Sequence, residues 1–109
     1  MFELDTVPEL VEPVLIAAFE GWNDAGESAS SAIRYLDGVW TATPLVAIDP
    51  DDYYDFQVTR PQIEVADGVR RHITWPTTRL TVVKSDEAGH DLVLVHGIEP
   101  NMRWRSFCE

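Results

Sequence analysis

The sequence has little of what exported and membrane-embedded proteins usually carry. It contains a single cysteine, Cys108, so no disulfide framework can form within the chain. No apolar run approaches the roughly 20 residues that cross a bilayer, and the longest runs are residues 14–19 and 92–95. The N-terminus from Met1 to Asp5 is acidic where a secretory signal peptide is basic. We therefore expect a soluble protein without membrane association, located in the cytoplasm.

Basic residues are scarce in the first half of the chain. Residues 1–57 carry twelve acidic residues and one base, Arg34, whereas residues 58–109 carry seven of each sign, and the net charge is −11. A nucleic-acid-binding surface needs a basic patch, so we expect no nucleic-acid partner. The structural interpretation of this acidity is that a high net charge keeps the protein in solution and makes copies of the chain repel one another. A protein partner with a basic face is the functional alternative.

Length and patterning predict one small α/β domain. With 109 residues, of which 45% are apolar, the chain is long enough for one domain and too short for two. Residues 1–13 are acidic and contain two prolines, which predicts an extended N-terminal arm. We expect residues 14–109 to be the N-terminal portion of a single α/β domain. Within them, residues 14–19 form a continuous apolar segment that is typical of a strand buried on both faces.

A helix and a second strand are predicted after this first strand. Apolar residues recur at helical spacing from Ala29 to Trp40. Asp24, with Glu27 three residues later, fits a capping box at the helix start. Residues 44–49 predict a strand, and a strand–helix–strand crossover gives strands that run parallel.

The rest of the chain predicts more strands than helices. Residues 62–65 and 69–75 flank an Asp-Gly turn, which indicates a hairpin. Residues 80–84 and 91–96 predict two further strands, and Pro100 suits the first turn of a final helix. One complete helix cannot cover both faces of such a sheet. We expect either another chain or further polypeptide to complete the fold, and we favour the latter.

Four segments together resemble one protein family. They read FEGWNDAG at 19–26, DFQVTRP at 55–61, ITWPTT at 73–78 and HGIEPNMRWR at 96–105. In order and wording they resemble the actinobacterial branch of the proteasome-assembly-chaperone-two family, from residue 14 onward. The resemblance implies a three-layer α/β/α sandwich with a mixed sheet, similar to the phosphorylase/hydrolase-like fold and incomplete in this chain. It also implies a longer protein, oligomeric relatives, and eukaryotic relatives that help to assemble proteasome rings without catalysis.

The glycine-containing turn at residues 21–26 lies between a strand and a helix, where ligands bind in open α/β sheets. However, Asp24 and Glu27 place carboxylates at the helix N-terminus, and the segment lacks both the dinucleotide-binding glycine pattern and a P-loop lysine. We interpret it as a turn that caps its own helix. The alternative is that Trp22 or Asn23 lines a ligand site.

Other polar residues have competing structural interpretations. His96 ends a buried strand. One hypothesis is that it acts as a general base with Glu99 as the acid. The favoured alternative is a structural histidine that is held by hydrogen bonds. Four aspartates between residues 49 and 55 offer oxygen ligands but lack EF-hand spacing, so we expect no metal and no cofactor. Arg60, Arg103 and Arg105 either bind anions, stack on an aromatic partner or pair with the acidic front half, and we favour pairing. Cys108 is interpreted as a small core residue.

Two functions remain open. The first is a non-catalytic, chaperone-like domain that oligomerises and binds protein partners. The second is a hydrolase- or phosphorylase-type enzyme acting on a small anionic or nucleoside-like ligand at residues 21–26 and 97–103. That cleft requires the strands before the two loops to be parallel and adjacent, or nearly so. The candidate ligand or interface residues are Trp22, Asn23, Asp24, His96, Glu99, Asn101 and Arg103.

Overall fold

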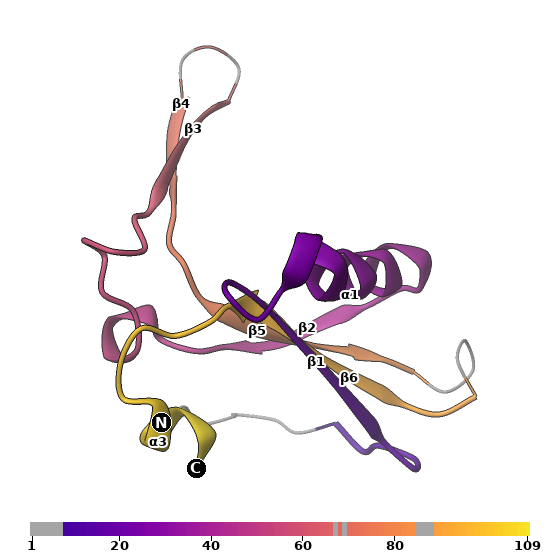
Figure 1. Ribbon diagram of the computed structural model, residues 1–109. Coiled ribbons are helices and arrows are strands. Elements are labelled where there is room, and N and C mark those ends of the chain that lie inside the picture. The colour runs from indigo at the N-terminus through magenta and orange to yellow at the C-terminus, as the bar shows by residue number, and fades with distance from the viewer. Residues whose placement is uncertain (1–7, 67, 69, 85–88) are drawn as a thin grey trace.

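The computed structural model describes residues 8–66, 68, 70–84 and 89–109. Its centre is a four-stranded sheet in the order β1-β6-β5-β2 (Figure 1). The strands are β1 (Val14–Glu20), β2 (Thr43–Ala47), β5 (Thr78–Val83) and β6 (Leu92–Ile98). β1 and β6 are parallel, whereas β5 is antiparallel to both β6 and β2. The prediction of a mixed sheet is confirmed.

Helix α1 (Ser28–Val39) lies across one face of this sheet and connects β1 to β2 (Figure 1). Its Ile33 packs against Val83, Leu92 and Leu94 of the sheet in a buried apolar cluster. Burial of such side chains is the main favourable contribution to folding. As predicted, β1 and β2 run in the same direction, but β6 and β5 lie between them.

The opposite face of the sheet is only partly covered. The short helix α3 (Trp104–Cys108) places Phe107 against Phe19 of β1 and against Tyr53, with ring centroids 5.9 and 5.3 Å away in edge-to-face geometry. Further along β1, Leu15 alternates to the same face as Phe19 and remains 63% exposed. Because Leu15 is exposed, the prediction that β1 is buried on both faces was wrong; β1 is also an edge strand of the described sheet. The three-layer sandwich remains a prediction.

The 3₁₀ helix η2 (Pro50–Asp52) leads into a buried tyrosine that joins two strands. The hydroxyl of Tyr54 donates to the carbonyl of Ile98 in β6 and hydrogen-bonds Thr78 of β5 at 2.8 Å. Burial raises the pKa of Tyr54 above its usual value, and the Thr78 hydrogen bond opposes this shift.

The end of β6 differs from the sequence prediction. Beyond the last paired residue of β6, the Glu99 N–H still donates to the Glu20 carbonyl at 2.9 Å. The N–H groups of Asn101 and Met102 then both donate to the Tyr53 carbonyl. Residues 99–103 are not helical, and Arg103 has a left-handed φ of 55°. The helix predicted at this point was therefore placed too early, and α3 begins at residue 104.

Strands β3 (Gln62–Ala66) and β4 (Arg70–Thr74) form the predicted antiparallel hairpin. It stands away from the sheet and from α1 (Figure 1). Asp67, in the predicted turn, lies outside the described residues.

The chain termini give two further outcomes. Within the described part of the predicted arm, residues 8–13, the Val11 N–H donates to the carboxylate of buried Asp91 at 2.6 Å. The division into an arm and a domain remains a prediction. Cys108 is exposed, so its interpretation as a core residue was wrong.

Asp24 caps helix α1, although not through the predicted capping box. Its Oδ1 accepts the N–H groups of Ala29 and Ser30 at 2.8 and 3.1 Å, and its Oδ2 accepts the Ser30 hydroxyl at 2.5 Å. Glu27 lies in the left-handed region (φ 58°), as does Gly26 (φ 61°), and makes no side-chain capping bond. The hydrogen bond from the Ser30 hydroxyl is the largest cause of a lowered Asp24 pKa; the two backbone N–H groups add to it, and burial opposes it.

Truncation of Ile33 should test the core between α1 and the sheet. Ile33→Ala is expected to lower the free energy of unfolding by about 2–5 kcal/mol, because it leaves a cavity that the sheet cannot fill. Urea unfolding followed by tryptophan fluorescence measures this loss. Val39→Ala, on the same helix but at a side chain that is 54% exposed, is the matched control and should change stability by only about 0.5 kcal/mol. Equal losses in the two variants would contradict the packing.

The Asp24 cap should make stability depend on pH. Because the folded-state pKa of Asp24 is lowered, its stabilising contribution is complete above the unfolded pKa of about 3.9 and is lost as the pH falls through the folded pKa. Asp24→Asn should therefore be less stable than the parent chain at neutral pH, and the difference should narrow below about pH 4. Urea midpoints across this range measure the effect, with Asp51→Asn as an exposed control. A difference that does not change with pH would refute this role.

Candidate functional site

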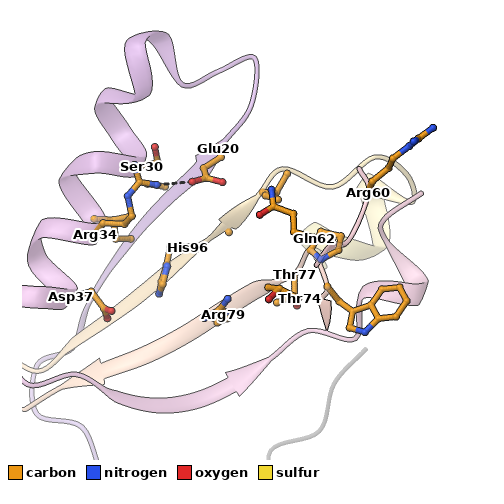
Figure 2. A pocket seen from close by; sticks show the side chains of 16 residues that line it. Glu20, Ser30, Arg34, Asp37, Arg60, Gln62, Thr74, Thr77, Arg79 and His96 are labelled. Carbon is orange, nitrogen blue, oxygen red and sulfur yellow. Dashed lines mark hydrogen bonds and ion pairs between the residues drawn. The ribbon is translucent and has the colours of Figure 1, made fainter. Parts of the chain in front are cut away.

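A cavity of about 420 Å³ lies beside α1, over the ends of β1 and β6, the start of β5 and the base of the β3–β4 hairpin (Figure 2). Small-molecule sites commonly have volumes of roughly 300–1,000 Å³. Charged and titratable side chains along its wall come from five different segments of the chain. They are Glu20, Arg34, Asp37, Arg60, Arg79 and His96. Of these, the sequence singled out only His96 as a site candidate.

His96 points toward α1 because it alternates to the same face of β6 as buried Leu94. Its cross-strand neighbours are Ala18 of β1 and Arg79 of β5. The Nε2 atom of His96 is buried and has no hydrogen-bond partner among the described residues. An unpaired buried polar group costs about 1–3 kcal/mol. The structure therefore does not show the hydrogen-bonded structural histidine that the sequence favoured.

The other charged groups around the cavity differ in how they are engaged. Arg34 forms an ion pair with Glu20 at 2.6 Å, and Asp37 accepts the hydroxyl of Thr81 at 3.2 Å. In the described part of the chain, Arg79 has neither an ion pair nor a hydrogen bond through its side chain. The guanidinium of Arg60 points away from the cavity (Figure 2). Arg79 is thus the cationic group of the wall that is available to a ligand.

The two loops of the enzyme hypothesis meet, because β1 and β6 are parallel neighbours. The Asn23 amide donates to one oxygen of Glu99 at 2.6 Å, and the Trp22 N–H donates to the other at 3.2 Å. The Glu99 side chain lies so close to Gly21, which has φ 143°, that a Cβ at this position would overlap it. The strand arrangement required for a cleft is present, but Glu99 fills the space between the loops.

The other sequence candidates lie in separate environments. Trp22 is fully exposed, Asp24 caps α1, and the Asn101 side chain accepts the Asp55 N–H at 2.9 Å. Arg103 pairs with Asp52 at 3.6 Å and lines a second hollow of about 240 Å³.

Two outcomes follow from these positions. Of the three arginines expected to pair with the acidic front half, Arg103 does so through Asp52, whereas Arg105 pairs with Glu109 at 2.9 Å and Arg60 has no ion pair among the described residues. Of the seven candidates, only His96 lines the larger cavity. Ligand or interface roles for the seven remain predictions.

Two further observations concern the described residues. Among the residues that the structure describes, no group of three or more His, Cys, Asp or Glu side chains is placed to hold a metal ion. None of the described helices is long and apolar enough to cross a membrane.

Comparison with known proteins identifies relatives of this chain. Residues 18–109 match the model of the PAC2 family. The structure is similar to a PAC2 family protein from Streptomyces avermitilis (TM-score 0.80, 61% identity, 88% of this chain and 41% of that chain). It is also similar to a proteasome-assembly chaperone homologue from Mycobacterium tuberculosis (TM-score 0.78, 50% identity, 86% of this chain and 40% of that chain). No curated protein matches.

The chain spans about two-fifths of the length of these two relatives. All four segments that suggested the family lie within the matched residues. The resemblance inferred from them is confirmed: this chain belongs to the PAC2 family.

Proposed function

We propose that this chain is part of a non-catalytic, chaperone-like assembly protein that binds other protein chains and associates with copies of itself. The family supports this proposal, as does the similarity to a proteasome-assembly chaperone homologue. A link to the proteasome is part of the proposal.

The projecting β3–β4 hairpin is the observation that carries the proposal. Ile63 pairs with Ile73 and Val65 with Arg71, so these four side chains share one face. Ile63, Val65 and Ile73 are 65%, 63% and 48% exposed. An isolated two-stranded hairpin is marginally stable in water, and exposed apolar patches of this kind mark protein interfaces. The hairpin is therefore suited to being covered by another chain.

Charge complementarity favours a second copy as the occupant. The hairpin carries the adjacent basic pair of the sequence, Arg70-Arg71, whereas residues 1–57 hold twelve acidic residues and one base. Among the paired strand residues, the face with Ile63 and Val65 carries Arg71 and no acidic residue, so an acidic surface attracts this face and steers association. Trp22, which is fully exposed in that acidic half, offers the kind of side chain that anchors interfaces. The proposed contact joins the hairpin of one copy to the acidic half of another.

The enzyme hypothesis has weaker support. Its two loops are adjacent, but Trp22 and Asn23 are hydrogen-bonded to Glu99 and do not line the cavity of about 420 Å³. We therefore assign no catalytic residue.

Self-association is tested by size-exclusion chromatography with light scattering on the 12.3 kDa chain. The parent chain should have the mass of at least two copies. Ile63→Asp removes an apolar anchor of the interface and Arg71→Glu reverses the charge beside it, so each should weaken association about tenfold or more. His72→Gln, on the opposite face of the hairpin, should associate like the parent chain.

Three results would count against the proposal. A parent chain that stays strictly monomeric at high concentration would contradict the proposed self-association. Unchanged association of Ile63→Asp and Arg71→Glu would exclude the hairpin as the contact. A monomer that binds only a different protein through the hairpin would replace the second copy with that partner. Circular dichroism of each variant verifies that it remains folded.

A further inference from the structure

The cavity beside α1 has no part in self-association through the hairpin, and its chemistry points to a ligand. The chain has a net charge of −11 and only eight basic residues, yet Arg34, Arg60 and Arg79 all border this one cavity. Guanidinium groups recognise carboxylates and phosphates through paired hydrogen bonds. Because Arg34 is paired with Glu20 and the Arg60 guanidinium points away, Arg79 is the group of this wall that indicates a site for an anion.

Arg79 is the group that would anchor this anion. Elsewhere in the described chain, Lys84, Arg103 and Arg105 lie 3.5, 3.6 and 2.9 Å from carboxylate oxygens. Arg79 has no such partner there. The two acidic side chains of the wall are already engaged, by an ion pair in one case and by a hydroxyl in the other. An incoming anion therefore meets a guanidinium without an ion-pair partner.

His96 provides a second polar contact beside Arg79. The two residues are directly paired across β5 and β6, and the unpartnered Nε2 of His96 is buried beneath the cavity wall. His96 itself lines the cavity, so another part of its ring is within reach of a ligand there. A neutral imidazole N–H can then donate to an oxygen of the ligand.

Both neutral polar and apolar residues complete the wall, and the apolar ones define the rest of the ligand. Ile33, Trp75, Pro76 and Ile98 line the same cavity. Its volume of about 420 Å³ exceeds what a bare phosphate or carboxylate occupies. We propose that this cavity binds a small organic anion, a carboxylate or a phosphate monoester, whose charge lies on Arg79 and His96 and whose apolar part packs toward Trp75 and Pro76.

The test is an NMR titration of the ¹⁵N-labelled 109-residue chain. Benzoate and phenyl phosphate are the two anionic probes, benzylamine is the probe of similar shape and opposite charge, and inorganic phosphate lacks the apolar part. Benzoate or phenyl phosphate should give saturable shifts at Arg79, the His96 ring and the Trp75 indole. The comparison of these two probes distinguishes a carboxylate from a phosphate ligand.

Variants show whether Arg79 carries the binding. Arg79→Gln should weaken the better probe about tenfold or more, because a charge-assisted hydrogen bond is lost. Arg79→Lys should retain part of the affinity as a point charge. Arg105→Gln removes an exposed arginine outside the cavity and should bind like the parent chain. The amide spectrum of each variant reports whether it is folded.

Each contrary result is specific. Absence of saturable shifts, or equal affinity in Arg79→Gln, would overturn the site. Tighter binding of benzylamine would show that the acidic wall residues dominate and would reverse the proposed charge. If inorganic phosphate binds as tightly as phenyl phosphate, the apolar part of the ligand does not contribute to binding. If the His96 ring signals do not shift, His96 does not contact the ligand. Self-association is measured separately, so failure of either proposal leaves the other testable.

Discussion

The parallel pairing of β1 with β6 is the contact on which the rest of the structure depends. The register from Val14 opposite Leu92 to Glu20 opposite Ile98 joins segments more than seventy residues apart. It brings the ends of both strands to one edge of the sheet, so Glu99 meets the turn at residues 21–26. It also sets which side chains of β6 face α1. β5 lies so close on the other side that a Cβ at Gly97 would overlap the Thr77 backbone.

This pairing gives the two faces of the sheet different properties. Leu94 and His96 both face α1, but Leu94 lies under the helix in the apolar cluster, whereas His96 lines the cavity. The same face thus provides both the core and a hollow lined by charged groups. On the other face, the cover is a short helix at one end, and Leu15 remains exposed. The proposed ligand cavity reaches the base of the hairpin through Gln62 and Thr74, whereas the proposed docking residues Ile63, Val65 and Ile73 do not line it.

Several elements were predictable from the sequence because their signals are local. The Asp-Gly turn identified the hairpin, helical spacing identified α1, and the continuous apolar run identified β1. The errors occurred where distant groups satisfied the backbone. Gly97 and Ile98 pair with β1 as the end of β6, so the final helix begins later than predicted. Asp24 caps α1 only because two left-handed residues turn the chain back toward it.

The sequence by itself determined the family, the α/β class and most element positions, because periodicity, turn chemistry and motif order depend on residues that are close together in the sequence. Only the tertiary structure decided which side chains share a site. Arg34, Arg79 and His96 lie on three elements, and no spacing along the chain relates them. Their proximity follows from strand order and register, which depend on packing between segments far apart in sequence.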